Sequence, residues 1–284
     1  MIDTKKELTI CWSITSRCNK SCYYCFSNYD SDSKKDMNNE IRKISVKKLE
    51  HLHEIFSLRI VLLGGEPTMY QDFENLCEEL TPIARKIIIV TNGTNIQRLP
   101  KNTFIDISYH GQNTADFFDI VNQIRKRNFV LVLCVIDPKC LKSCYEVSDF
   151  CRKECIPFEA IPLVNNATEE SIYYTDSILS GFTSNIQYEN LDLFGKKTNL
   201  EIYRQSRDII PEKRLRICEQ KNIALYADGS IYPCCKTGWM KYRNRIESNK
   251  AFQYEILCEY PYCMKHRGCL DMAGWRQDPD EKLF

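Results

Sequence analysis

Apolar residues along this chain gather in short runs that alternate with stretches of helical spacing. Short apolar runs that end in turn residues are typical of β-strands. Six of them predict strands over residues 8–14, 59–63, 86–90, 104–107, 129–136 and 157–163. Helical spacing predicts helices over residues 45–56, 72–80, 114–126 and 141–154. Ser45 is the expected N-cap of the first helix, whose apolar face carries Val46, Leu49, Leu52 and Phe56.

The repeated order of strand and helix predicts an α/β fold with a parallel sheet and helices outside it. Six units fit a partial (β/α)6 barrel of the TIM type better than a closed barrel of eight. Polar or glycine-rich segments follow the first four strands, over residues 18–25, 64–68, 91–93 and 108–110. Because the carboxyl ends of parallel strands meet at one edge of a sheet, these segments are expected to form one active site.

Three cysteines stand at the spacing CxxxCxxC directly after the first strand: Cys18, Cys22 and Cys25. A 4Fe–4S cluster needs four thiolates, and no fourth cysteine lies nearby in the sequence. One iron would therefore keep an open position at which a small molecule can bind. Zinc is the alternative, since thiolates also suit this metal, although zinc ribbons usually pair one CxxC with a second.

The cysteine segment resembles the CxxxCxφC signature of radical S-adenosylmethionine (SAM) enzymes, in which φ is aromatic and is filled here by Tyr24. Gly64-Gly65-Glu66 resembles the GGE motif of that family, and residues 91–93 resemble the TNG that often ends its third strand. The match covers residues 8 to 165, with the motifs in the family's order. A tight turn with a surface glutamate is the alternative for the GGE segment taken alone.

The resemblance implies the ligands of a cofactor. In radical SAM enzymes the three cysteines hold the cluster, SAM binds its open iron, and the GGE segment contacts the amino group of the methionine moiety. The residues expected to contact SAM are Tyr24, Gly64, Gly65, Glu66, Thr91, Asn92 and Ser108.

Six further cysteines lie between residues 218 and 269. Asp228-Gly229 predicts a hairpin that brings Cys218 and Cys234 together. A zinc knuckle is one interpretation. The segment also resembles the opening of SPASM and twitch domains, which carry auxiliary iron–sulfur clusters in radical SAM enzymes. That resemblance implies a barrel over residues 1–190 and a small extension over residues 191–284.

The cysteine pattern departs from a full SPASM domain, because the expected CxxC before Cys263 is absent, Cys258 lying five positions back, and no cysteine follows Cys269. One auxiliary 4Fe–4S cluster is therefore expected, with Cys218, Cys234, Cys263 and Cys269 as its ligands. Cys235 and Cys258 would remain free as reserve ligands, as buried spacers or as thiols that return a hydrogen atom to a substrate radical.

Cysteines also recur in the predicted fourth helix, where Cys140, Cys144, Cys151 and Cys155 fall on one face. The outer two would be about 22 Å apart along a helix, too far to share a metal. This face is expected to pack into the core.

Length and charge set further bounds. The chain has 284 residues and a net charge of +1, which gives no electrostatic argument for nucleic acid or an anionic membrane. The N-terminus lacks the apolar region of a secretory signal, and no apolar run is long enough to span a bilayer. A soluble, cytoplasmic protein is expected. In that setting sixteen cysteines indicate metal or redox use rather than disulfides.

By resemblance, one electron cleaves SAM to methionine and a 5′-deoxyadenosyl radical, which abstracts hydrogen from a substrate carbon. A flavodoxin- or ferredoxin-type protein is the expected electron donor. The expected reaction is dehydrogenation or epimerisation of a small molecule such as a sugar or aminocyclitol. Crosslinking or epimerisation of a ribosomally made peptide is the alternative. A non-catalytic electron carrier or a zinc-stabilised binding protein would leave the GGE motif unexplained.

Overall fold

The computed structural model of the chain describes residues 5–25, 36–165, 170–171, 174–182, 216–219, 222–229, 231–232, 255–258 and 275–277. The six predicted barrel strands are present as β1 (Lys6–Thr15), β2 (Phe56–Gly64), β3 (Ala84–Thr91), β4 (Phe104–Tyr109), β5 (Phe129–Ile136) and β6 (Phe158–Pro162). The helices between them are α1 (Asn39–Ile55), α2 (Phe73–Leu80), α3 (Thr114–Arg125) and α4 (Leu141–Lys153). Short 3-10 helices are η2 (Pro67–Met69), η3 (Ile96–Arg98) and η4 (Pro138–Cys140).

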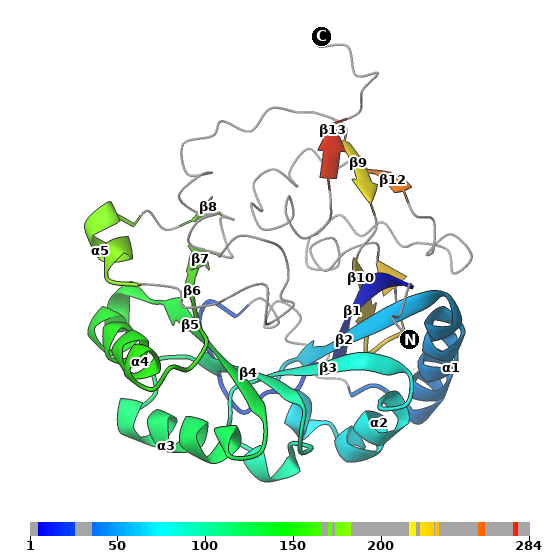
Figure 1. Cartoon of the computed structure of the whole chain (residues 1–284), viewed down its shortest axis with the longest axis horizontal. Coiled ribbons are helices and arrows are strands. Elements are labelled where there is room, and N and C mark those ends of the chain that lie inside the picture. The colour runs from blue at the N-terminus through cyan, green and yellow to red at the C-terminus, as the bar shows by residue number, and fades with distance from the viewer. Residues whose placement is uncertain are drawn as a thin grey trace.

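The central sheet follows the chain in order. Its strands lie as β11-β10-β1-β2-β3-β4-β5-β6, in which β10 is Asn222–Tyr226 and β11 is Ile231–Tyr232, and each of β1 to β6 pairs in parallel with the next. Figure 1 shows the curved sheet with α1, α2, α3 and α4 along one side of it, from α1 near β1 to α4 near β5. The predicted α/β partial barrel is confirmed.

Strand alternation explains why the helices cover one side. In β4, Ile105, Ile107 and Tyr109 are fully buried in the core that the helices share. The residues between them point to the opposite face, since successive side chains of a strand alternate. Burying each large apolar side chain contributes roughly 1.5–3 kcal/mol, so the helix-facing side of the sheet supplies most of the hydrophobic stabilisation.

Two helix predictions need correction. The first helix begins at Asn39 rather than at Ser45, because the side chain of Asn38 accepts a hydrogen bond from the backbone N–H of Ile41 and caps it. Phe56, placed on that helix by spacing, is the first residue of β2.

The fourth helix ends at Lys153, so Cys155 lies beyond it, exposed and with a φ of +53°. The predicted core face therefore holds for Cys144 and Cys151, which are buried, but not for Cys155. Cys140 is only partly buried.

The Asp228-Gly229 hairpin is confirmed, with β10 (Asn222–Tyr226) antiparallel to β11 (Ile231–Tyr232) and Gly229 at a φ of +79°. Unexpectedly, β10 pairs in parallel with β1 and thereby lengthens the barrel sheet at its β1 edge. The predicted boundary at residue 190 stays a prediction, but this hairpin beyond it belongs to the central sheet.

The remaining described strands form small sheets. In one sheet β9 (Arg216–Glu219) lies between β12 (Glu255–Cys258) and β13 (Trp275–Gln277), and β7 (Val164–Asn165) pairs with β8 (Glu170–Ser171) in another. A short helix, α5 (Asp176–Ser180), completes the set. None of the helices in the described ranges is long and apolar enough to cross a membrane.

Candidate active site

The loop that carries the three cysteines leaves β1 and is fastened at its start to the end of β2. The backbone N–H of Gly65 donates to the carbonyl of Thr15 over 2.8 Å, and that of Glu66 donates to the carbonyl of Arg17 over 2.7 Å. A Cβ atom on Gly65 would lie 2.1 Å from the Arg17 carbonyl oxygen, and one on Gly64 would lie 2.2 Å from that of Thr15. The glycine pair, expected to let the backbone approach a ligand, is thus required by the approach of the protein's own backbone.

The Glu66 carboxylate is turned into the protein and is only 1% exposed. Its Oε1 accepts from the backbone N–H of Thr68 over 3.2 Å, from the hydroxyl of Thr68 over 2.6 Å and from the hydroxyl of Thr91 over 2.7 Å. Its Oε2 accepts from the backbone N–H of Asn92 over 2.7 Å. These four bonds tie the end of β2 to the end of β3. The expected contact of Glu66 with the SAM amino group stays a prediction.

Asn92 extends this connection to the cysteine loop. Its side-chain Nδ2 donates to Asn19 Oδ1 over 2.9 Å and lies 3.8 Å from Cys18 Sγ. Its Oδ1 accepts from the backbone N–H and the hydroxyl of Thr94, and the Thr94 hydroxyl accepts from Asn19 Nδ2 over 2.7 Å. The backbone N–H of Lys20 donates to Cys18 Sγ over 3.4 Å. The end of β3 therefore holds the first half of the loop.

Two adjacent tyrosines hold the second half. The Tyr24 hydroxyl lies 3.1 Å from His110 Nδ1, with the two rings stacked at 6.1 Å. The Tyr23 hydroxyl donates to Asp137 Oδ1 over 2.8 Å, and the Lys139 ammonium lies 3.7 Å from the centre of its ring. The ends of β4 and β5 thus contact the loop as well.

Sequence reasoning missed most of these partners. His110 entered it only within the polar segment 108–110, and Asn19, Asp137 and Lys139 were not identified. Tyr24 and His110 are 86 residues apart, and Tyr23 and Asp137 are 114 apart, so no short-range pattern links them.

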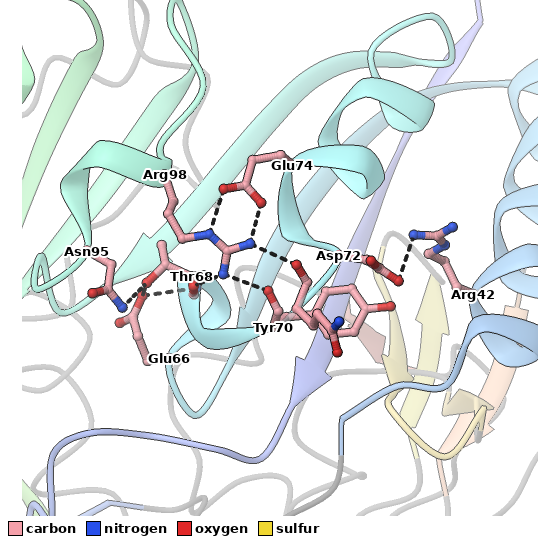
Figure 2. Close-up of polar contacts among 9 residues, drawn as sticks. Arg42, Glu66, Thr68, Tyr70, Asp72, Glu74, Asn95 and Arg98 are labelled. Atoms are coloured by element: carbon pink, nitrogen blue, oxygen red, sulfur yellow. Dashed lines mark hydrogen bonds and ion pairs between the residues drawn. The ribbon is translucent and has the colours of Figure 1, made fainter.

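An arginine fixes the segment that follows the GGE motif (Figure 2). Arg98, at the end of η3, donates to the backbone carbonyls of Thr68, Tyr70 and Gln71 at 2.6, 2.8 and 2.9 Å. Its guanidinium also forms a two-point ion pair with Glu74. These bonds hold Thr68 where two of its donors meet the Glu66 carboxylate.

Three thiols on one loop are the donor set that three irons of a 4Fe–4S cluster would use. Among the described residues, no group of three or more His, Cys, Asp and Glu side chains has the geometry of a single-ion site, as a zinc ligand set would. Thiolates of a cluster bind different irons and so need not converge on one point. Burial raises the pKa of the Cys18 and Cys22 thiols, so cluster binding must displace their protons. The backbone N–H of Lys20 and the side-chain amide of Asn92 face Cys18 Sγ, and a sulfur that ligates iron accepts hydrogen bonds from such groups.

The face of the sheet turned away from the helices carries Ser108 and, two residues before it, Asp106. Ser108 is partly buried, and no contact of its hydroxyl tests its predicted role toward SAM. Asp106 is 8% exposed, and no hydrogen bond to its carboxylate occurs within the described residues. Burial, together with the nearby Glu159, raises the pKa of Asp106 to about 7.

The predicted auxiliary ligands are described only in part. Cys218 lies in β9, opposite Ile256 of β12 and Trp275 of β13, and Cys258 ends β12 opposite Arg216. Cys234, Cys235, Cys263 and Cys269 lie outside the described residues.

Comparison with known proteins gives the class of this barrel. Residues 12–133 match the model of the radical SAM superfamily, and they include the end of β1, the cysteine loop, the GGE segment and β2 to β4. This part of the chain therefore belongs to the radical SAM superfamily, as its motifs predicted.

The relatives are distant. GTP 3′,8-cyclase of Haemophilus influenzae is 34% identical over 88 residues, which cover 28% of this chain and 25% of that protein. Fe-coproporphyrin III synthase of Methanosarcina barkeri is 30% identical over 109 residues, covering 37% and 27%. The chain thus spans about a quarter of the length of these curated relatives.

Among solved structures, Streptococcus suis SuiB bound to its precursor peptide SuiA aligns with a TM-score of 0.60 at 16% identity, covering 88% of this chain and 64% of SuiB. SuiB has also been solved bound to S-adenosylmethionine. At this identity the likeness establishes a shared fold.

Proposed function

We propose that this protein is a radical SAM enzyme that reductively cleaves SAM and uses the resulting 5′-deoxyadenosyl radical to abstract hydrogen from a substrate carbon. The observation that carries the proposal is the placement of Cys18, Cys22 and Cys25 on one loop that the ends of β2, β3, β4 and β5 hold. When bound, the cluster supplies the electron that breaks the sulfur–C5′ bond of SAM and releases methionine.

The chain's own residues hold this loop in place. Gly64 and Gly65 allow the start of the cysteine loop to contact the end of β2 closely. The hydrogen bonds of Glu66 join the ends of β2 and β3. Fixed thiols and fixed donors need no rearrangement when an electron arrives, which is how a protein tunes a cofactor.

The direct test removes the thiols. Replacing Cys18, Cys22 and Cys25 together by Ala is expected to abolish 5′-deoxyadenosine formation from SAM under anaerobic reduction. Cys155→Ala, an exposed cysteine outside any helix, is the matched control and should retain full activity. Normal 5′-deoxyadenosine formation by the triple variant would refute the proposal.

The second part of the proposal is one auxiliary 4Fe–4S cluster held by Cys218, Cys234, Cys263 and Cys269. Reconstituted protein should then contain about eight irons, and the triple variant about four. Four irons together with zinc in the unchanged protein would point to a zinc knuckle.

The backbone register supports Cys258 as an alternative ligand for this cluster. Ile256 of β12 lies opposite Cys218 of β9, and Cys258 stands two residues after Ile256 on β12. Iron counts on Cys258→Ala and Cys263→Ala, each measured separately, distinguish the two ligand sets.

The proposed substrate is a small molecule that is dehydrogenated or epimerised. The names of the sequence relatives support a small substrate, since one is a cyclase of GTP and the other a synthase of Fe-coproporphyrin III. Peptide modification is the alternative, which the SuiB complex with its precursor peptide supports. Turnover of candidate substrates in deuterated water, read by mass spectrometry, separates loss of hydrogen from its exchange.

An epimerase would need a hydrogen donor, and Cys235 and Cys258 are the proposed thiols. Cys235→Ala and Cys258→Ala, tested separately, should identify the donor as the variant that keeps its clusters but no longer incorporates deuterium. Product without solvent deuterium from the unchanged protein would exclude this role.

A further inference from the structure

Tyr24 lies between Cys22 and Cys25, and its hydroxyl is 3.1 Å from His110 Nδ1. The same side chain also forms a hydrogen bond with Cys22. A turn between the backbone N–H of Cys25 and the carbonyl of Cys22 brackets Tyr24. The position of this ring is therefore coupled to the position of two of the three cysteines.

His110 is itself held firmly. It directly follows β4, and its backbone N–H donates to Gln112 Oε1 over 2.8 Å. The next residue, Gly111, has a φ of +76°, a conformation that glycine adopts readily. The imidazole thus projects from the fixed end of a central strand onto the cysteine loop.

The imidazole of His110 is held in its uncharged form. Burial, together with the nearby Lys20, lowers the pKa of His110 to about 4. A neutral imidazole with its hydrogen on Nε2 can accept at Nδ1, so the tyrosine hydroxyl is able to donate to it.

We propose that His110 is a positioning residue for SAM binding: its Nδ1 accepts the Tyr24 hydroxyl and fixes the ring, and with it the cysteine loop, in the geometry that SAM meets. This inference rests on the proposed function. It assigns no contact between His110 and the reacting atoms, and it requires only the acceptor at Nδ1.

Substitutions at residue 110 separate this acceptor from other properties of the imidazole. His110→Asn places an amide oxygen where Nδ1 stood, whereas His110→Gln carries its terminal amide at the position of Nε2, and His110→Phe keeps a ring without an acceptor. Tyr24→Phe removes the donor. Tyr145→Phe is the matched control, because it removes a tyrosine hydroxyl that donates to the Ile178 carbonyl, between α4 and α5.

The primary measurement is the equilibrium dissociation constant of SAM for the reconstituted, oxidised protein, with iron content determined on each sample. His110→Phe, His110→Gln and Tyr24→Phe should each weaken SAM binding about three- to tenfold, the value of one hydrogen bond, with iron content unchanged. The double variant Tyr24→Phe/His110→Phe should bind SAM as weakly as Tyr24→Phe alone, which also removes the hydroxyl that bonds Cys22. His110→Asn should bind within about twofold of the unchanged protein.

Two results would overturn the proposal. Unchanged SAM binding by His110→Phe would show that the contact does not position the loop. Equal weakening by His110→Asn and His110→Phe would show that the imidazole acts other than by accepting at Nδ1. Both results require SAM binding and 5′-deoxyadenosine formation by the unchanged protein. Absence of those two activities would refute the proposed function instead.

Discussion

The two ends of the parallel sheet use their charged residues in different ways. At the amino end, Glu7 forms ion pairs of 3.1 Å with both Arg59 and Arg85, and the Arg85 side chain is 57% exposed. At the carboxyl end, Glu66 is 1% exposed and receives four hydrogen bonds from uncharged donors. Glu7 therefore joins the exposed Arg85 to Arg59, whose side chain is only 4% exposed, whereas Glu66 is surrounded by uncharged donors.

This difference determines what each group contributes. An exposed ion pair is worth little because water and salt screen it. A buried carboxylate is stabilised by the donors around it, and the loss of any one leaves its oxygens less well hydrogen-bonded. The carboxyl end is therefore the end at which small changes should disturb the cysteine loop.

The largest effect is expected from Gly65→Ala. The added Cβ would lie 2.1 Å from the Arg17 carbonyl oxygen, so β2 and the start of the loop must separate. We expect a loss of roughly 3 kcal/mol or more of unfolding free energy together with loss of bound iron. Urea unfolding and iron analysis measure the two effects, and a variant with full stability and full iron would contradict the role given to this glycine.

Asp106, between the two ends, should show the next largest effect, with opposite sign. Its folded pKa of about 7 exceeds the unfolded value near 3.9, so the folded state retains a proton that the unfolded chain has released. The stabilisation that this proton gives to the folded state is present at low pH and is lost as pH rises toward 7. Asp106→Asn cannot ionise at this position. Its unfolding free energy relative to that of the unchanged protein should therefore rise by roughly 3 kcal/mol from about pH 4 to pH 8.

The check for Asp106 is urea unfolding at several pH values, with Glu74→Gln as a control. The pairing with Arg98 lowers the pKa of Glu74. The stability of Glu74→Gln relative to the unchanged protein should therefore fall as pH rises from the acid range. Parallel stability curves for Asp106→Asn and the unchanged protein would exclude a raised pKa at Asp106.

Glu66→Gln is expected to cost about 2 kcal/mol. The shape is conserved, but the amide NH2 must now face a donor: the backbone N–H of Thr68 if it takes the place of Oε1, or that of Asn92 if it takes the place of Oε2. The loss should appear in both thermal unfolding and SAM binding, since the same bonds hold the loop. Unaltered stability would show that these donors find other partners.

The smallest effect is expected from Arg85→Ala at the amino end. Its exposed pairing with Glu7 should contribute no more than about 0.5 kcal/mol, and iron content should not change. A loss comparable to that of Glu66→Gln would remove the contrast between the two ends of the sheet.

The strand and helix order could be predicted from the sequence because it depends on neighbouring residues. Apolar runs and helical spacing located all six barrel strands and four helices, and Asp228-Gly229 located the hairpin. Local signals were weaker at boundaries: Asn38 was a better cap than Ser45, and the fourth helix stopped before Cys155.

The cysteine loop, its family and its place at the carboxyl end of β1 followed from the sequence alone, since the motif and the preceding strand are contiguous. Only the tertiary structure decided what surrounds the loop. It brought β10 beside β1, turned Glu66 inward, placed the Arg17 carbonyl against Gly65, and joined Tyr24 to His110 across 86 residues. The physical reason is that parallel pairing aligns strand ends that are distant in the chain, and no local spacing encodes which side chains then meet.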